Sequence, residues 1–259
     1  MGDSKLFSLD DRVAVVVGGA GVLAGEMAAG LAGAGAGVVI VDVDDEKAAA
    51  QVERLRSATG AEVIAAHADA TRKGDLQAAL AATLEHFGRV DVLLNAAGIN
   101  SGTPFFEIEE EEWHRILDVD LKSVFLACQV FGRAMVDAGR GGSIINISSV
   151  SSGPPLSKVL TYGVAKAGVN QITQFLARDL APHRIRVNAI MPGFFPAEQN
   201  RRLLTQERTA SIITHTPMGR FGEARELVGA AVYLACDEAA SFVTGSILRV
   251  DGGFTATTI

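Results

Sequence analysis

The amino-acid sequence predicts an α/β fold in which helices cover both faces of a parallel β-sheet. Short, continuously apolar segments alternate with longer segments that have helical spacing. The apolar segments are rich in Val and Ile and show little polar alternation, which is typical of strands buried on both faces. The first of them, 12–20, runs directly into glycines, and polar or turn-forming residues end several of the others.

Seven segments have the composition of buried strands: 12–20, 38–42, 62–69, 90–98, 141–149, 184–193 and 246–251. Small apolar residues at helical spacing predict the first helix, and polar amphipathic sequences predict the next two. The expected helices are 24–37, 44–59, 71–87, a long helix from the acidic run 109–112, one from Thr161 and one over about 223–236. No repeat or linker interrupts this order, so we expect a single domain over 1–259.

Composition narrows the class of protein. Hydrophobic residues make up 48% of the chain, charged residues 20%, and the formal net charge is −7. This mild acidity argues against a nucleic-acid partner. No apolar run approaches the roughly 18 residues that a membrane span needs, and the polar N-terminus lacks a secretory signal, so we expect a cytoplasmic protein without a membrane partner. Cys128 and Cys236 match no metal or redox spacing, which predicts buried thiols and no metal site.

The turn after the first strand is suited to a dinucleotide pyrophosphate. Gly18 and Gly21 allow close approach of the backbone, and Val22 and Leu23 follow them, just before the helix whose N-terminus must point at the phosphates. A glycine-rich turn that binds no ligand would have the same sequence pattern. Asp42, about 20 residues on at the end of the second strand, favours the ligand, because its carboxylate can accept both ribose hydroxyls. It would also repel a 2′-phosphate, which favours NAD over NADP.

The next two strands also end in candidate cofactor residues. Asp69, followed by Ala70, could meet the adenine edge, although Asp69 would serve equally well as the N-cap of the following helix. Asn95, Ala96 and Gly98 lie in the sequence NAAG, whose small side chains let the backbone pass close to a cofactor. In an open parallel sheet, ligands bind at the carboxyl ends of strands, where all these residues are expected.

The segment 148–166 carries the candidate chemistry. Tyr162 and Lys166 are four residues apart, so in a helix they share one face about one turn apart. An ammonium beside a phenol favours the phenolate, so we expect the pKa of Tyr162 to fall below its usual value of about 10. Such a tyrosine can exchange a proton with a carbonyl or alcohol oxygen. Ser148 and Ser149 end the preceding strand, and either hydroxyl could bind the same oxygen. Alone, such a Tyr/Lys pair is weak evidence, because most lie on solvated faces.

Together these features resemble the short-chain dehydrogenase/reductase family over essentially the full length of the chain. The matching elements are the glycine turn, Asp42, Asp69, NAAG at 95–98, Ser149, YGVAK at 162–166, PG at 192–193 and the terminal VDGGF. The resemblance implies a Rossmann-type, doubly wound sheet of about seven strands and a homotetramer or homodimer. It also implies hydride transfer between a nicotinamide and a carbonyl or alcohol carbon.

The resemblance also assigns roles to individual residues. It makes Tyr162 the general acid/base, while Lys166 lowers its pKa and holds the nicotinamide ribose. It gives Ser149 the task of positioning the reacting oxygen. The sequence PGFF at 192–195 would border the nicotinamide, which adds Pro192, Gly193 and Phe195 to the cofactor residues.

The chain departs from the family pattern at four positions. Val17 replaces a threonine, and Val22 and Ala24 replace two glycines of the turn, so we expect a locally shifted turn that still binds the cofactor. Asp120 stands where relatives carry an asparagine that supports a water chain to the lysine. Asp120 could be neutral or paired; if ionised near Lys166, it would oppose formation of the phenolate and shift activity to alkaline pH.

The substrate residues are predicted from 193–222, the expected substrate loop. The sequences at 192–204 and 215–222 resemble the D-mannonate oxidoreductase (fructuronate reductase) branch, whose members handle sugar acids. Gln199, Asn200, Arg201 and Lys158 could bind hydroxyls and a carboxylate, with Phe194 as an apolar wall. An arginine there could equally be solvated. Reduction of a 3-oxoacyl thioester stays open, as does a dinucleotide-binding sensor that has lost turnover.

Overall fold

The computed structural model describes residues 6–196 and 205–257. Its core is a seven-stranded parallel sheet with the order β3-β2-β1-β4-β5-β6-β7. The strands are β1 (Val13–Val17), β2 (Gly37–Asp42), β3 (Val63–His67), β4 (Val92–Asn95), β5 (Gly142–Ile147), β6 (Ile185–Pro192) and β7 (Ile247–Val250). All except β2 are shorter than the apolar segments of the sequence, because the flanking glycines and polar residues leave the ladder. The predicted doubly wound α/β fold is confirmed.

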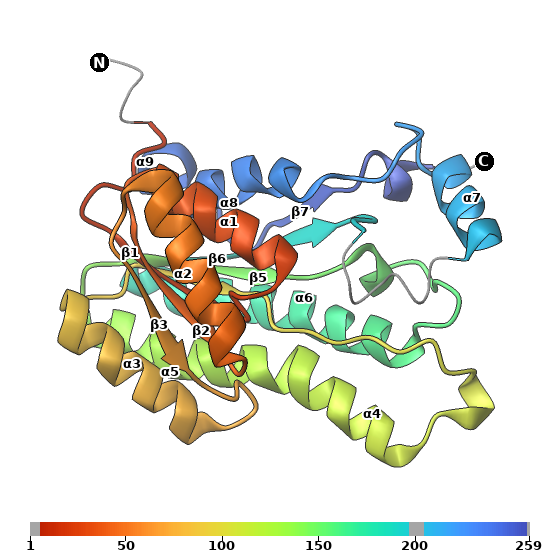
Figure 1. Ribbon diagram of the computed structural model, residues 1–259, viewed down its shortest axis with the longest axis horizontal. Helices are drawn as coiled ribbons and strands as arrows, with labels where there is room; N and C mark the ends of the chain where they lie inside the picture. The colour runs from red at the N-terminus through yellow and green to blue at the C-terminus, as the bar shows by residue number, and fades with distance from the viewer. Residues whose placement is uncertain (1–5, 197–204, 258–259) are drawn as a thin grey trace.

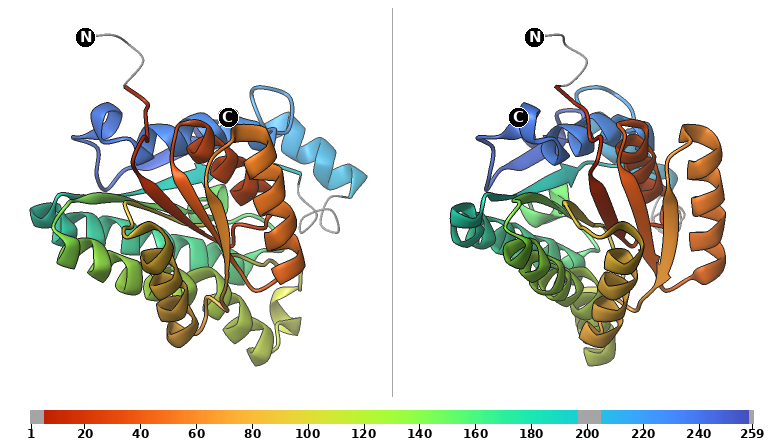
Figure 2. Two further views of the ribbon diagram at one scale, coloured as in Figure 1. Left: turned by 60° about the vertical axis from the view of Figure 1, so that its left-hand side comes forward. Right: turned by 90° about the vertical axis from the view of Figure 1, so that its left-hand side faces the viewer.

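The helices form two layers on opposite faces of the sheet (Figures 1 and 2). The helices are α1 (Val22–Gly33), α2 (Asp45–Thr59), α3 (Lys73–Phe87), α4 (Glu110–Leu117), α5 (Ser123–Ala138), α6 (Leu160–Leu180), α7 (Gln206–His215), α8 (Val228–Ala235) and α9 (Asp237–Ala240). One apolar cluster joins α1, α2 and α8 to the sheet, and a second joins α3, α5 and α6 to its other face. Strands that are apolar throughout are therefore needed, because side chains on both faces are buried.

Two helical segments differ from the prediction. The long helix expected from 109–112 is divided, because a π-helical turn at Asp118–Lys122 separates α4 from α5. The stretch after β6, expected to be irregular, contains α7, a helix whose Thr205 caps it by accepting a hydrogen bond from the Arg208 amide. The sequence signal for α7 is weak because Ile212 is its one buried side chain among the described residues.

The register of the sheet places the ends of its central strands side by side. Val17 at the end of β1 pairs with Val41 of β2 on one side and with Asn95 of β4 on the other. The chain leaves β1 in one direction to build β2 and β3, and crosses in the other direction to build β4 onward. This reversal opens a crevice between β1 and β4 at the carboxyl edge, the place where parallel α/β sheets bind ligands.

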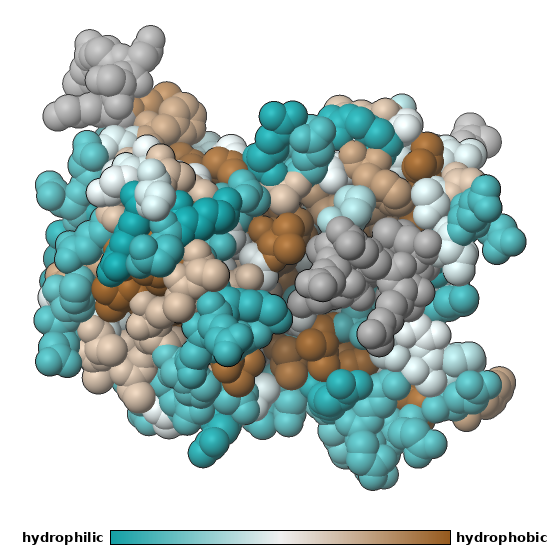
Figure 3. All heavy atoms as spheres, in the orientation of Figure 1, coloured by the Kyte–Doolittle hydropathy of each residue, from teal (hydrophilic) through white to brown (hydrophobic). Residues whose placement is uncertain are grey.

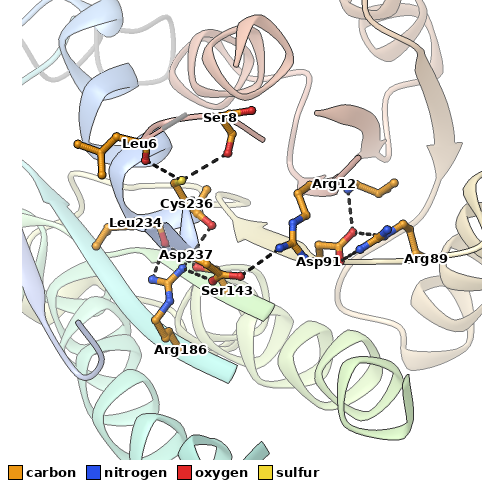
Figure 4. A network of polar contacts seen from close by, with 12 residues as sticks. Leu6, Ser8, Arg12, Arg89, Asp91, Ser143, Arg186, Leu234, Cys236 and Asp237 are labelled. Carbon is orange, nitrogen blue, oxygen red and sulfur yellow. Dashed lines mark hydrogen bonds and ion pairs between the residues drawn. The ribbon is translucent and has the colours of Figure 1, made fainter. Parts of the chain in front are cut away.

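The amino edge of the sheet carries a charged network (Figure 4). Asp91, which is 2% exposed, accepts hydrogen bonds from the Val13 amide at 2.9 Å and from the Arg89 guanidinium at 2.7 Å. Arg12 lies between Asp91 and Asp237, 3.5 Å from each carboxylate. The buried charge is therefore fully compensated and ties β1 to β4 and α9. This network is structural and lies away from the carboxyl edge.

Within the described residues, the helices are all too short or too polar to cross a membrane. Cys128 and Cys236 are both buried and free, as predicted. Burial raises the pKa of the Cys128 thiol to about 12, so this cysteine is unreactive.

Candidate active site

One cavity at the carboxyl edge brings together two of the residues predicted for catalysis, Ser149 and Tyr162, and the residues predicted to border the nicotinamide. Its lining includes Ser149, Tyr162, Pro192, Gly193, Phe194 and Phe195, with Leu23, Asn100 and Arg208. In the orientation of Figure 1, apolar surface gathers near the middle of the visible face, between polar regions (Figure 3). Separate parts of the chain thus meet here: the start of α1, the segment after β4, the end of β5, the first turn of α6, the end of β6 and the first turn of α7.

Ser149 is positioned by the sharp end of β5. The strand stops at Ile147, and Ser149 caps a short 3₁₀ turn by accepting a hydrogen bond from the Ser151 amide at 3.2 Å. Its side chain is 7% exposed and faces the cavity. Of the two candidate serines, Ser148 is the more deeply buried, and its hydroxyl is directed at the Lys166 carbonyl and the Ser152 hydroxyl. The Ser149 hydroxyl donates to the Ser151 hydroxyl at 3.2 Å and lies close enough to the Tyr162 phenol to lower its pKa, so Ser149 is the serine placed to share a substrate oxygen with Tyr162.

Helix α6 places Tyr162 and Lys166 on one face, as the four-residue spacing predicts. The Lys166 ammonium lies 5.5 Å from the centre of the Tyr162 ring. It is 3% exposed and donates to the Ile147 carbonyl at 3.1 Å, which anchors it beneath the end of β5. A lysine that is buried and held in this way cannot be a solvated surface charge. The pair therefore belongs to the site.

Asp120 lies next to this pair and completes a buried triad. One of its carboxylate oxygens is 3.4 Å from Lys166 Nζ, and the other accepts a hydrogen bond from the Ile99 amide at 2.9 Å. The π turn at Asp118–Lys122 carries Asp120, in agreement with the tendency of π turns to occur at functional sites. Gly98 packs against it, because a Cβ there would lie 2.7 Å from the Asp120 carboxylate.

The predicted direction of the Tyr162 pKa was wrong. Burial is the largest effect and raises the pKa of Tyr162; Lys166 lowers it, Asp120 raises it and the hydrogen bond from Ser149 lowers it, and the net result is a raised pKa. The sequence argument counted the ammonium and left out burial and the opposing carboxylate. Burial likewise raises the pKa of Asp120, although Lys166 opposes this. At neutral pH the phenol is therefore protonated and ready to donate.

Asp120→Asn should move the pH profile of alcohol oxidation to more acidic values. Oxidation needs the phenolate, and loss of the Asp120 charge removes one of the effects that raise the pKa of Tyr162. The asparagine oxygen can still accept from Ile99, which preserves the backbone geometry. The measurement is kcat/KM for oxidation across the neutral and alkaline range. A profile identical to that of the parent enzyme would exclude an electrostatic role for Asp120.

The turn after β1 requires glycine and leads into the uncapped N-terminus of α1. Gly18 has a φ of +73°, and a Cβ on it would lie 2.6 Å from the Ala97 backbone. Helix α1 begins at Val22 with Gly21 as its N-cap, and no side chain caps its free amides. Val22 is 53% exposed at this end. Free helix amides beside an open glycine turn fit a dinucleotide pyrophosphate.

The carboxylates at the ends of β2 and β3 bond to nearby backbone. Asp42 accepts from the Ala20 amide at 3.0 Å and from the Asp44 amide at 3.1 Å, so it fixes the glycine turn as well as standing at its edge. Asp69 accepts from the Thr71 amide at 2.9 Å and hydroxyl at 2.7 Å. The alternative role of Asp69 as the helix N-cap was wrong, because α3 begins at Lys73 with Arg72 as its N-cap, and Asp69 instead holds the turn at Thr71 that precedes the helix. The contact of Asp69 with adenine stays a prediction, and so does that of Ala70.

Asn95 is buried and its side chain points away from the cavity. Its amide nitrogen donates to Asn146 at 2.9 Å, and Asn146 donates to Thr173 at 2.9 Å, which links β4, β5 and α6. The amide nitrogen of Asn95 is therefore used within the core, and contact of Asn95 with a cofactor stays a prediction. Ala96 and Gly98 follow it as half-buried residues along the crevice.

The predicted substrate residues differ in whether the structure places them in the cavity lining. Phe194 and Phe195 line the cavity, and Phe194 stacks edge-on against Phe254. Lys158 is exposed and is not part of this lining. The residues Gln199, Asn200 and Arg201 lie outside the described residues.

Arg208 was missed by the sequence reasoning, although it lines the cavity. Thr205 and Glu207 ahead of it form a helix-start pattern that could have indicated α7. Nothing in the sequence, however, indicated where that helix packs.

Comparison with known proteins agrees with this geometry. A family model described as enoyl-(acyl carrier protein) reductase matches residues 19–255. The chain is 37% identical over 251 residues to a 5-keto-D-gluconate 5-reductase of Escherichia coli (strain K12), covering 96% of this chain and 98% of that one. It is 34% identical over 256 residues to an NAD-dependent glycerol dehydrogenase of Listeria innocua, with 98% of each chain covered.

A solved structure shows the same fold. The gluconate 5-dehydrogenase of Burkholderia cenocepacia J2315, in complex with NADP and tartrate, matches with a TM-score of 0.94 and 35% identity, covering 99% of this chain and 100% of that one. The predicted resemblance to the D-mannonate oxidoreductase branch gains no support from these relatives. The family itself is confirmed: this chain belongs to the short-chain dehydrogenase/reductase family of nicotinamide-dependent oxidoreductases.

Proposed function

We propose that the protein interconverts a ketone and a secondary alcohol on a sugar acid, with NAD(H) as its preferred dinucleotide. The observation that carries this proposal is the shared cavity of Ser149 and Tyr162, with Lys166 buried behind them. The relatives named for gluconate derivatives support a sugar acid as substrate. We further propose that the chain is a single cytoplasmic domain, that it forms a homo-oligomer and that 193–222 acts as its substrate loop.

In this mechanism the protein binds the reacting oxygen and moves one proton. The bound dinucleotide supplies or accepts the hydride at its nicotinamide ring. Ser149 donates a hydrogen bond to the substrate oxygen, and Tyr162 donates its phenolic proton to that oxygen as the ketone is reduced. Lys166 stabilises the phenolate that results. In the reverse direction the phenolate accepts the alcohol proton, so oxidation needs a higher pH than reduction.

A substrate panel tests the proposal. We expect NADH-dependent reduction of 5-keto-D-gluconate to exceed that of simple ketones and of an acetoacetyl thioester. The thioester belongs in the panel because the matching family model is described by an acyl carrier protein reductase. Preference for the thioester would replace the sugar acid with 3-oxoacyl reduction as the function. Dinucleotide binding without turnover of any of these substrates would contradict the proposal and favour a sensor.

Asp42→Asn should weaken the preference for NADH over NADPH by about tenfold, the effect of roughly 1.4 kcal/mol. The amide oxygen can still accept from Ala20, while the negative charge that repels a 2′-phosphate is lost. The measurement is kcat/KM with each dinucleotide for the parent and the variant. Asp45→Asn is the matched control, since the Asp45 side chain is 75% exposed. A parent enzyme that prefers NADPH would contradict the assignment to NAD, and the solved relative does contain NADP.

A further inference from the structure

The cavity has one formally charged side chain among the described residues that line it, Arg208. The rest of the lining consists of apolar side chains, hydroxyls, glycine and an amide. Partial burial of a charge without a counter-charge costs free energy, so the presence of an arginine in this cavity needs an explanation. The cavity is also the place where Ser149 and Tyr162 hold the reacting oxygen. Any anionic group on the same substrate would meet this guanidinium.

Arg208 is held in place by neutral partners. Its Nη1 donates to the Ser157 hydroxyl at 2.9 Å and its Nη2 to the Ser157 carbonyl at 3.1 Å. Its own amide donates to Thr205 at 3.2 Å, which fixes the backbone of the first turn of α7. Ser157 lies just before Leu160, where α6 begins. Arg208 is therefore anchored to the loop that leads into the catalytic helix.

Two other arginines, Arg54 and Arg220, are neutralised by carboxylates. Arg54 pairs with Glu26 at 2.6 Å and Arg220 pairs with Glu226 at 2.6 Å. Within the described residues, Arg208 has no carboxylate within 4.0 Å, and its two bonds to Ser157 use only part of its five N–H donors. The remaining donors form a planar fork that matches a carboxylate in geometry and charge.

We propose that Arg208 binds the carboxylate of the substrate and is the residue that selects acids over neutral ketones. This inference rests on the proposed function, which supplies the ketone and the acid on one small molecule. Ser149 and Tyr162 hold the reacting oxygen at one end, and Arg208 holds the carboxylate at the other. Two-point binding of this kind fixes which carbon faces the hydride donor. Lys158 and Arg201 are not needed for this role.

The experiment compares two probes that differ only at one terminal carbon, which is charged in one probe and neutral in the other. 5-Keto-D-gluconate and L-sorbose share their hydroxyl pattern and keto group, and L-sorbose carries a CH₂OH in place of the carboxylate. For Arg208→Gln we expect kcat/KM for the acid to fall about ten- to hundredfold, the loss of one charge-assisted contact. The value for L-sorbose should be unchanged. Arg208→Lys should recover part of the loss, because it restores charge without the planar fork.

Two control variants distinguish the loss of the proposed carboxylate contact from structural effects of a substitution. Arg178→Gln, on the exposed side of α6, should change neither probe, since its side chain is 72% exposed. Ser157→Ala removes the hydroxyl that Arg208 bonds but keeps the guanidinium, so it should weaken reduction of the acid by less than Arg208→Gln does. Thermal unfolding and NADH binding show whether each variant is folded and binds the dinucleotide.

The outcomes separate the inference from the proposed function. A parent enzyme that prefers the acid, together with an Arg208→Gln variant that loses this preference, supports both. An Arg208→Gln variant that keeps the preference, or loses activity equally on both probes, overturns the role of Arg208 and leaves the proposed function intact. A parent enzyme that does not prefer the acid over L-sorbose overturns the proposed function itself, and this is seen before any variant is made.

Discussion

Tyr162→Phe should lower kcat/KM about 10²- to 10⁴-fold in both directions, because it removes the proton that the reacting oxygen receives or gives up. The phenol is the one group in the described cavity lining that is placed both to donate this proton and to be stabilised as an anion by Lys166. Ser149 can bind the oxygen, but its described neighbours, the Ser151 hydroxyl and the protonated Tyr162 phenol, are not bases that would accept its proton. Steady-state rates with 5-keto-D-gluconate and with its alcohol product measure the effect.

The chain provides a matched control for this substitution. It contains two tyrosines, and Tyr233 on α8 packs against the apolar cluster on the other side of the molecule. Tyr233→Phe removes the same atom and should leave the rates unchanged. NADH binding should be equal in both variants. A Tyr162→Phe enzyme with the activity of the parent would show that the proton comes from another group.

Lys166→Met should lower the free energy of unfolding by about 3–5 kcal/mol, because it leaves the Asp120 carboxylate buried without its partner. Both side chains are buried, at 4% and 0% exposure, and the carboxylate is 3.4 Å from the ammonium. Without Lys166, the unopposed burial raises the pKa of Asp120 further. When the pKa of a carboxyl is higher in the folded protein than in the unfolded chain, the free energy of unfolding falls as pH rises between the two pKa values. The destabilisation should therefore grow with pH, which denaturant titrations at several pH values would show.

The double variant Lys166→Met with Asp120→Asn separates stability from catalysis. It removes the lone carboxylate, so it should recover much of the lost stability while activity stays low, since no ammonium then stabilises the phenolate. Lys122→Met is the surface control on the same π turn: Lys122 pairs with Asp118 at 3.2 Å with both side chains 48% exposed, and its loss should cost at most about 1 kcal/mol. A Lys166→Met protein as stable as the parent would mean that Asp120 is protonated when buried.

Much of the fold could be predicted because burial on both faces of a parallel sheet leaves a strong mark in the sequence. The segment VAVVV of β1 is buried at each position, and a continuously apolar strand can pack in few other ways. The placement of Ser149 and Tyr162 followed from the same logic, since one ends a strand and the other begins the next helix. Helix α7 was not predicted, because a helix with one described buried residue has little apolar periodicity in its sequence.

The sequence by itself determined the order of strands and helices, the glycine turn and the spacing of Tyr162 and Lys166, because each depends on residues close together in the chain. Only the tertiary structure decided the direction of the Tyr162 pKa and the place of Arg208. Both depend on groups that are distant in sequence: Asp120 and the buried surroundings of Tyr162 in one case, and the packing of α7 on the loop at Ser157 in the other. Electrostatic energies depend on burial and on distances through space, which local sequence patterns do not encode.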